Sequence, residues 1–105
     1  MIDTQMSKGI IDMVVLEIIR REDTYGYKIV EELKFYGFYS ISEGTIYPIL
    51  QRLLKKNLIL GIYKKSKIGP RRKYYYITQN GIEYLNRFKT NWQDMINAVE
   101  KVFKR

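Results

Sequence analysis

The sequence has 105 residues and carries 19 Lys and Arg against 11 Asp and Glu, a formal net charge of +8. It contains no Cys and no His, which excludes thiolate nucleophiles, disulfides, Cys/His zinc sites and histidine-based catalytic triads. Because the acidic residues are also scattered, with no paired or metal-spaced cluster, we expect no enzyme, no metal and no cofactor. A hydrophobic content of 46% predicts one globular domain, small enough to gain from a second copy.

The excess positive charge is confined to one window of the sequence. Between Glu43 and Glu83 there are nine basic residues and no acidic one, whereas the rest of the chain holds ten basic and eleven acidic residues. A local positive field of this kind indicates a polyanion such as nucleic acid as the partner. The nine basic residues are Arg52, Lys55, Lys56, Lys64, Lys65, Lys67, Arg71, Arg72 and Lys73.

A first helix is predicted over residues 4–21, with an apolar face so broad that the helix must be nearly enclosed. After a polar break, Thr24 or Asp23 can cap a second helix. This helix is predicted to run to about Tyr36 and to end at Gly37.

We expect no membrane partner and a cytoplasmic location. The most apolar run, residues 9–19, includes Asp12 and Glu17 and is much shorter than the ~20 residues of a membrane span. No basic n-region or small-residue cleavage site indicates export.

A third helix is predicted from its N-cap Ser42 to about Lys56, with apolar residues on one side and polar residues on the other. The polar side presents candidates for contact with bases or phosphates. An ordinary solvated helix face is the alternative interpretation. The candidates are Ser42, Thr45, Tyr47 and Gln51, with Arg52 and Lys55 as cations that neutralise phosphate.

A β-hairpin with a cationic tip is predicted next. Residues 58–64 and 72–78 are rich in Ile, Leu and Tyr, and the segment between them has Gly-Pro turn chemistry. Three successive tyrosines in the second strand alternate between its faces, so at least one must point inward. The candidate DNA contacts here are Lys65, Arg71, Arg72 and Lys73, and a loop whose charges only confer solubility is the alternative.

One further candidate lies in the second helix. Lys28 is placed to reach a phosphate, and a local ion pair with Glu31 or Glu32 is the alternative.

A last helix is predicted from Gln79 to Phe103, capped by Thr78. Its apolar residues recur at alternating spacings of three and four, an a/d seam of about two and a half heptads that predicts a contact with a second subunit. The predicted dimer interface consists of Ile10, Leu85, Phe88, Trp92, Met95, Val99 and Val102.

Trp92 has two interpretations that stay open. In a dimer, two copies on facing helices can sandwich a flat aromatic or cationic small molecule, with Met6, Met13 and Met95 as adaptable pocket walls. The alternative is an ordinary interface anchor, with the methionines in the core.

The order helix, helix, helix, hairpin, helix is that of a winged helix-turn-helix, a mainly α fold with a small β-hairpin. Residues 1–78 form the predicted DNA-binding domain and residues 79–105 the predicted dimerisation helix. In this arrangement the third helix enters the major groove, while the hairpin, or wing, reaches the backbone or the adjacent minor groove.

Four segments carry a family resemblance: residues 9–16, residues 25–29, Gly44-Thr45-Ile46-Tyr47-Pro48, and residues 69–78 followed by Gly81. At these segments the chain resembles the PadR-like family of bacterial transcriptional regulators, and its single C-terminal helix is similar to the short subgroup. The resemblance implies a homodimeric repressor of a nearby efflux, detoxification or stress gene, bound to a pseudo-palindromic double-stranded DNA operator and released by a small molecule. It also implies the ligand-stacking role for Trp92. Two rivals are a sequence-nonspecific nucleic-acid-binding architectural module and an adaptor whose last helix binds a different protein.

Overall fold

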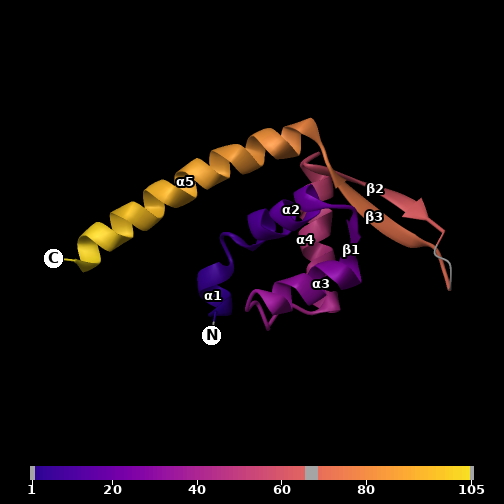
Figure 1. The fold of residues 1–105 in the computed structure, drawn as a ribbon, viewed down its shortest axis with the longest axis horizontal. Helices are drawn as coiled ribbons and strands as arrows, with labels where there is room; N and C mark the ends of the chain where they lie inside the picture. The colour runs from indigo at the N-terminus through magenta and orange to yellow at the C-terminus, as the bar shows by residue number, and fades with distance from the viewer. Residues whose placement is uncertain (1, 66–68, 105) are drawn as a thin grey trace.

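The computed structural model describes residues 2–65 and 69–104. In Figure 1 the short helices and the sheet form a head, the hairpin projects from one end of it, and the long last helix extends away at the other. The molecule measures 57 × 30 × 20 Å along its principal axes. The elements in chain order are α1 (Thr4–Ser7), α2 (Ile11–Arg21), β1 (Thr24–Tyr25), α3 (Gly26–Phe35), α4 (Glu43–Lys55), β2 (Ile59–Lys64), β3 (Arg72–Ile77) and α5 (Gln79–Phe103).

The single helix expected over residues 4–21 is wrong, because the chain breaks there into α1 and α2. Asp3 caps α1, its carboxylate accepting from the backbone N–H groups of Gln5 at 2.7 Å and Met6 at 3.1 Å. The break between the two helices contains Gly9, the residue type least favourable to a helix in this stretch.

The expected capping of the second helix by Thr24 or Asp23 is also wrong. Thr24 and Tyr25 form β1, which pairs antiparallel with β3 opposite Tyr75 and Tyr74, and α3 begins at Gly26. The hairpin therefore gains a third strand in the order β1-β3-β2. A strand of two residues is too short to show an alternating pattern in the sequence. It forms because the edge of β3 that is not paired with β2 is free to pair with it.

The predicted hairpin is confirmed, with Ile59 opposite Ile77 and Lys64 opposite Arg72 at its two ends. Tyr75 is buried, as the alternation of the three tyrosines requires. Its burial anchors the wing to the head of the molecule.

The core holds α4 in place by its inner face. Ile46, Leu50 and Leu53 are fully buried, and they belong to one apolar cluster with residues of α2 and α3 such as Leu16 and Leu33. Since a fully buried aliphatic side chain contributes about 1.5–3 kcal/mol, this ridge fixes the orientation of the opposite, exposed face.

The connection into α5 is closed by Thr78, as predicted. Its hydroxyl accepts from the N–H of Gly81 at 2.9 Å and donates to the carbonyl of Asn57 at 2.7 Å. The start of α5 is thereby tied to the end of α4. Within the described residues, no helix is long and apolar enough to cross a membrane.

Candidate nucleic-acid interface

The first turn of α4 presents two of the predicted DNA contacts, and they contact each other. The N–H of Ser42 donates to the hydroxyl oxygen of Thr45 at 2.7 Å, and the Thr45 hydroxyl donates to the carbonyl of Ser42 at 3.0 Å. Both residues are exposed. Thr45 is therefore a helix cap as well as a surface group.

The remaining outer face of α4 is exposed, with Tyr47, Gln51 and Lys55 pointing away from the core. Tyr47 is 54% exposed and lies beside the start of α3, because a Cβ added to Gly26 would be 3.6 Å from its hydroxyl oxygen. This contact brings the outer face of α4 next to the first turn of α3.

Arg52 differs from the other predicted contacts on α4. Its guanidinium donates twice to the carboxylate of Asp12 on α2, at 2.9 and 2.8 Å. This bidentate pair ties α4 to α2 and neutralises a cation predicted to meet phosphate.

Two more cations near this surface have acidic partners. Lys28 pairs with Glu22 at 2.9 Å, not with Glu31 or Glu32. Lys64 on β2 lies 3.6 Å from Asp23. Part of the positive window is therefore compensated by acids that precede it in sequence.

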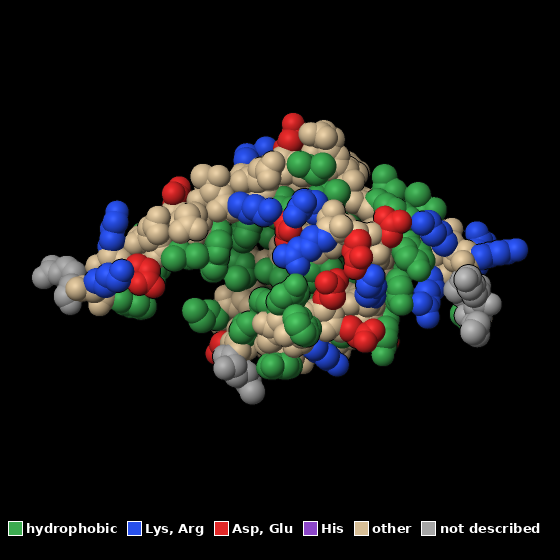
Figure 2. All heavy atoms as spheres, viewed as in Figure 1, with side chains coloured by type: hydrophobic (Ala, Val, Ile, Leu, Met, Phe, Trp, Pro, Cys, Tyr) green, Lys and Arg blue, Asp and Glu red, His purple; other side chains and the backbone are tan. Residues whose placement is uncertain are grey.

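The cations at the entry to β3 have no such compensation. Within the described part of the chain, Arg71, Arg72 and Lys73 make no ion pair with a carboxylate. They lie over tyrosine rings instead, as in the 4.4 Å between the Arg72 guanidinium carbon and the centroid of the Tyr25 ring. Figure 2 shows basic side chains gathered at the hairpin end of the molecule. Lys65 is exposed there, whereas Lys67 and its neighbours 66 and 68 lie outside the described residues.

The predicted dimer seam is divided by the structure. Leu85 is fully buried within its own chain, and Ile10 and Phe88 are half-buried. The exposed part of the seam begins at Trp92, which stacks on Phe88 with ring centroids 6.3 Å apart and ring planes 12° apart. Beyond it, the exposed residues of the seam are Met95, Val99 and Val102.

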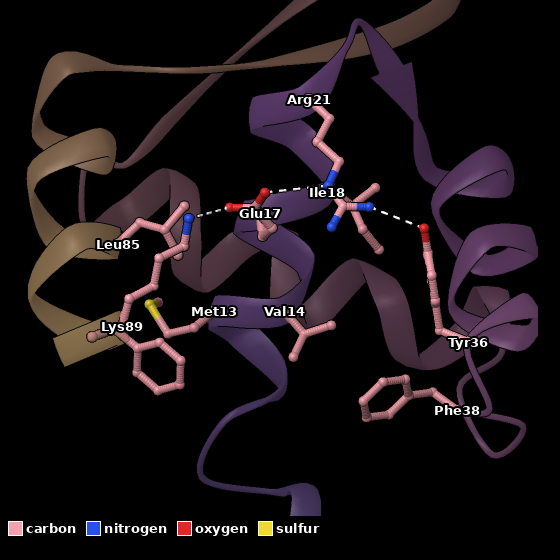
Figure 3. Close-up of a pocket in the computed structure, with 10 residues that line it drawn as sticks. Met13, Val14, Glu17, Ile18, Arg21, Tyr36, Phe38, Leu85 and Lys89 are labelled. Carbon is pink, nitrogen blue, oxygen red and sulfur yellow. Dashed lines mark hydrogen bonds and ion pairs between the residues drawn. The ribbon is translucent and has the colours of Figure 1, made fainter. Parts of the chain in front are cut away.

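The structure places the predicted effector residues in three different parts of the chain. Met13 is buried in the core, whereas Met6 is 84% exposed on α1, and Trp92 and Met95 lie on α5. Met13 lines an apolar pocket of about 320 Å³ between α2, the end of α3 and α5, drawn in Figure 3. Trp92, Met6 and Met95 are not among the residues that line it.

The polar residues at the edge of this pocket, Glu17, Arg21, Tyr36 and Lys89, were not predicted from the sequence. Glu17 accepts hydrogen bonds from Arg20 at 2.6 and 3.0 Å and from Arg21 at 3.2 Å, and it pairs with Lys89 on α5 at 2.9 Å. Arg21 in turn donates to the Tyr36 hydroxyl at 3.0 Å, as Figure 3 shows. Arg20 first, and then Lys89 and Arg21, lower the pKa of Glu17 to about 2 against the opposing effect of burial. The spacing of Glu17, Arg20 and Arg21 on one helix is a readable signal.

Comparison with known proteins agrees with this architecture. The model of the transcriptional regulator PadR-like family matches residues 15–87. The crystal structure of a PadR-like transcriptional regulator from Bacillus cereus is similar at a TM-score of 0.88 and 42% identity, covering 96% of this chain and 98% of that one. An uncharacterised protein of Lysinibacillus sphaericus is 32% identical over 102 residues, 95% of this chain and 94% of its own.

A more distant structure shares the fold. Bacillus subtilis PadR in complex with operator DNA is similar at a TM-score of 0.68 and 23% identity, covering 75% of this chain and 46% of that one. The matched family is one of transcriptional regulators, which confirms the expectation that the chain is not an enzyme. With a family model that matches most of its length and a winged-helix fold shared with solved members, the chain belongs to the PadR-like family of transcriptional regulators.

Proposed function

We propose that this PadR-like regulator binds a pseudo-palindromic DNA operator as a homodimer and represses a nearby efflux, detoxification or stress gene until a small molecule releases it. The observation that carries the DNA-binding part is the convergence of α4 and the wing. Tyr47 of α4 and the uncompensated cations Arg71, Arg72 and Lys73 line the same surface hollow. One duplex can therefore contact both elements at once.

In the proposed complex, α4 lies in the major groove and the wing grips the backbone. Ser42, Thr45, Tyr47 and Gln51 face the bases or the groove edge, and Lys55 with the wing cations neutralises phosphates. Arg52 acts mainly through Asp12, by holding α4 against α2. The operator complex of Bacillus subtilis PadR, a protein of the same fold, supports DNA as the partner.

The proposed dimer uses the exposed end of α5. From Trp92 onward the helix lies beyond the core of its own chain and carries Met95, Val99 and Val102 on one face, exposed by 58%, 44% and 70%. Pairing with the same face of a second copy removes this apolar surface from water. Two recognition helices then address half-sites about one helical turn, ~34 Å, apart.

The proposed effector site lies around Trp92 in that dimer. Its partly exposed ring already stacks on Phe88, so a flat aromatic or cationic molecule can extend the stack. Binding there would change the angle between the α5 helices and move the recognition helices off groove spacing. Quenching of this tryptophan, the only one in the chain, by a panel of such compounds tests the site. A compound that releases operator equally from Trp92→Ala contradicts it.

The deciding experiment is a footprint over the promoter next to the gene of this protein, with competition by random duplex. We expect a protected pseudo-palindrome and a preference of about 10³ or more over random DNA. A ratio near one would instead support the sequence-nonspecific architectural module.

A further inference from the structure

A hollow of about 320 Å³ lies between α3, α4 and the wing on the proposed DNA-binding side. The proposed function brings a duplex to this hollow but does not say which group of the DNA enters it. The start of α3, the outer face of α4 and the two strands of the wing all contribute to it. Of the described residues that line it, five are tyrosines, three are Lys or Arg, and none carries a carboxylate. This chemistry is that of an anion site.

The cations of the hollow are ordered before any ligand arrives. The Nζ of Lys73 lies 5.7 Å from the centroid of the Tyr63 ring and 5.9 Å from that of Tyr75, and Arg71 lies 5.9 Å from the Tyr63 ring. Arg72 is held in the same way over Tyr25. A cation held over a ring loses less rotamer entropy when it binds an anion than a freely rotating one.

Within the described chain, the cations of the hollow also differ from neighbouring cations in having no acidic partner. Arg52, Lys28 and Lys64 each have a carboxylate partner, at 2.8, 2.9 and 3.6 Å. Among the described residues, those around the hollow have none. The charge of the three cations at the hollow is therefore not compensated by any carboxylate that the structure describes.

Hydroxyl groups gather at the same place. The hydroxyl oxygen of Tyr47 lies beside the first residue of α3, and Tyr63 and Tyr75 face it from the wing. Burial, followed by the nearby hydroxyls of Tyr47 and Tyr63, raises the pKa of Tyr75. None of these three hydroxyls makes a hydrogen bond with another described residue. Each has its O–H available to donate.

We infer that this hollow binds one phosphodiester group of the DNA backbone, on the strand that passes between α4 and the wing. Arg71, Arg72 and Lys73 neutralise its charge, and the hydroxyls of Tyr47 and Tyr63 donate to its oxygens. Tyr47 and Tyr63 are 54% and 59% exposed, so a phosphate that remains part of a chain can enter from the surface. The inference rests on the proposed DNA-binding function and adds Tyr63 to the residues that contact DNA.

The test uses the full chain and a promoter duplex in which one phosphate at a time is replaced by an uncharged methylphosphonate. In the wild type we expect one linkage in each half-site to weaken binding about tenfold when neutralised. A Tyr47→Phe/Tyr63→Phe variant keeps both aromatic rings, including that of Tyr63 beneath Arg71 and Lys73, and removes only the hydroxyls. It should bind the native duplex about tenfold more weakly. Neutralising the same linkage should then cost less than in the wild type, about threefold, because the hydroxyl contacts are already lost while the cations still meet a charged phosphate.

Tyr84→Phe is the matched control. Its ring also lies beneath cations, with Lys56 at 6.0 Å and Arg87 at 5.5 Å, but it does not line the hollow. This variant should keep the wild-type affinity and the full penalty at the sensitive linkage.

Equal penalties in the wild type and the double variant would overturn the phosphate site while leaving DNA binding intact. If the wild type binds promoter and random duplex equally well, the repressor proposal fails. The affinities of the wild type and the variants are then compared on a random duplex. There, about a tenfold loss in the double variant but not in Tyr84→Phe supports the site, and equal affinities overturn it.

Discussion

Among single residues, Glu17 connects two helices, although its sequence spacing predicts pairs within α2 alone. Its carboxylate holds Arg20 and Arg21 of its own helix and Lys89 of α5. Since α5 carries the proposed dimer surface, this carboxylate links that surface to the DNA-binding head. Protonation of this carboxylate therefore weakens the contact between α2 and α5.

The pKa of Glu17 is lowered from its ordinary 4.5 to about 2 in the folded protein. A lowered folded pKa means that the contribution is present above pH 4.5 and is lost as the pH falls from 4.5 toward 2. We expect Glu17→Gln to lower the free energy of unfolding at pH 7 by about 2 kcal/mol and to show a shallower loss below pH 4.5. Urea unfolding at several pH values measures both. Glu31→Gln, at an exposed position, is the control, and a wild-type acid profile in Glu17→Gln would contradict the assignment.

Gly81 is a second residue with a specific requirement. A Cβ there would collide with the carbonyl oxygen of Leu58 and lie 2.7 Å from Cγ1 of Ile77. Although Ala favours helices, we expect Gly81→Ala to destabilise the fold by about 1–3 kcal/mol. Thermal unfolding measures this loss. Gly9→Ala, with nothing within 4 Å of the added atom, should be neutral or slightly stabilising.

At the scale of elements, the first turn of α4 combines a cap with a proposed readout surface. Because the Thr45 side chain bonds both backbone groups of Ser42, Thr45→Ala should cost about 1 kcal/mol of stability and also relax operator specificity. Thr45→Ser keeps the hydroxyl and separates the two roles. It should restore stability, and competition between operator and mismatched duplexes then shows whether the methyl group matters for specificity. Unchanged specificity in Thr45→Ala would leave Thr45 as a cap alone.

The wing is the element expected to supply affinity without sequence preference. Arg71→Ala/Arg72→Ala should weaken binding to operator and random duplex alike and reduce the slope of log K against log salt by roughly 2, since two phosphate contacts are lost. Titrations at several salt concentrations measure the slope. Lys8→Ala/Lys101→Ala removes the same charge from other exposed positions and serves as the control. A slope equal to that of the wild type would rule out the wing contact.

At the scale of the whole molecule, the elongated shape of one chain reflects a helix that extends past its own core. We expect the wild type to sediment as a dimer at micromolar concentration. Val99→Asp/Val102→Asp should give monomers and a much weaker operator complex, because a buried charge opposes the apolar contact. Thr90→Asp lies on the opposite face of α5 and should leave the dimer intact. A wild-type monomer would favour the adaptor, whose α5 binds a different protein.

Several elements could be predicted because their signals are local. Ser42 and Thr78 mark helix starts, the apolar residues of α4 recur at the helical period, and two Tyr- and Ile-rich runs flank a Gly-Pro turn. A cap, a helical face or a hairpin depends on residues within a few positions of each other. The predicted site on α4 and the wing follows from the same signals together with the charge window.

Short-range hydrogen bonding and periodicity encode three helices followed by a hairpin and a last helix, the polar face of α4 and the cationic wing. These features could therefore be predicted from the sequence, whereas the break after α1 and the strand β1 could not. Which cations remain uncompensated depends on contacts between elements that are distant in the sequence. Arg52 meets Asp12 across 40 positions, and the Glu17–Lys89 pair likewise depends on where α2 and α5 meet. The same holds for the tyrosine hollow between α3, α4 and the wing. Such contacts depend on how the buried faces of the elements pack. A local sequence pattern does not predict which exposed groups this packing brings together.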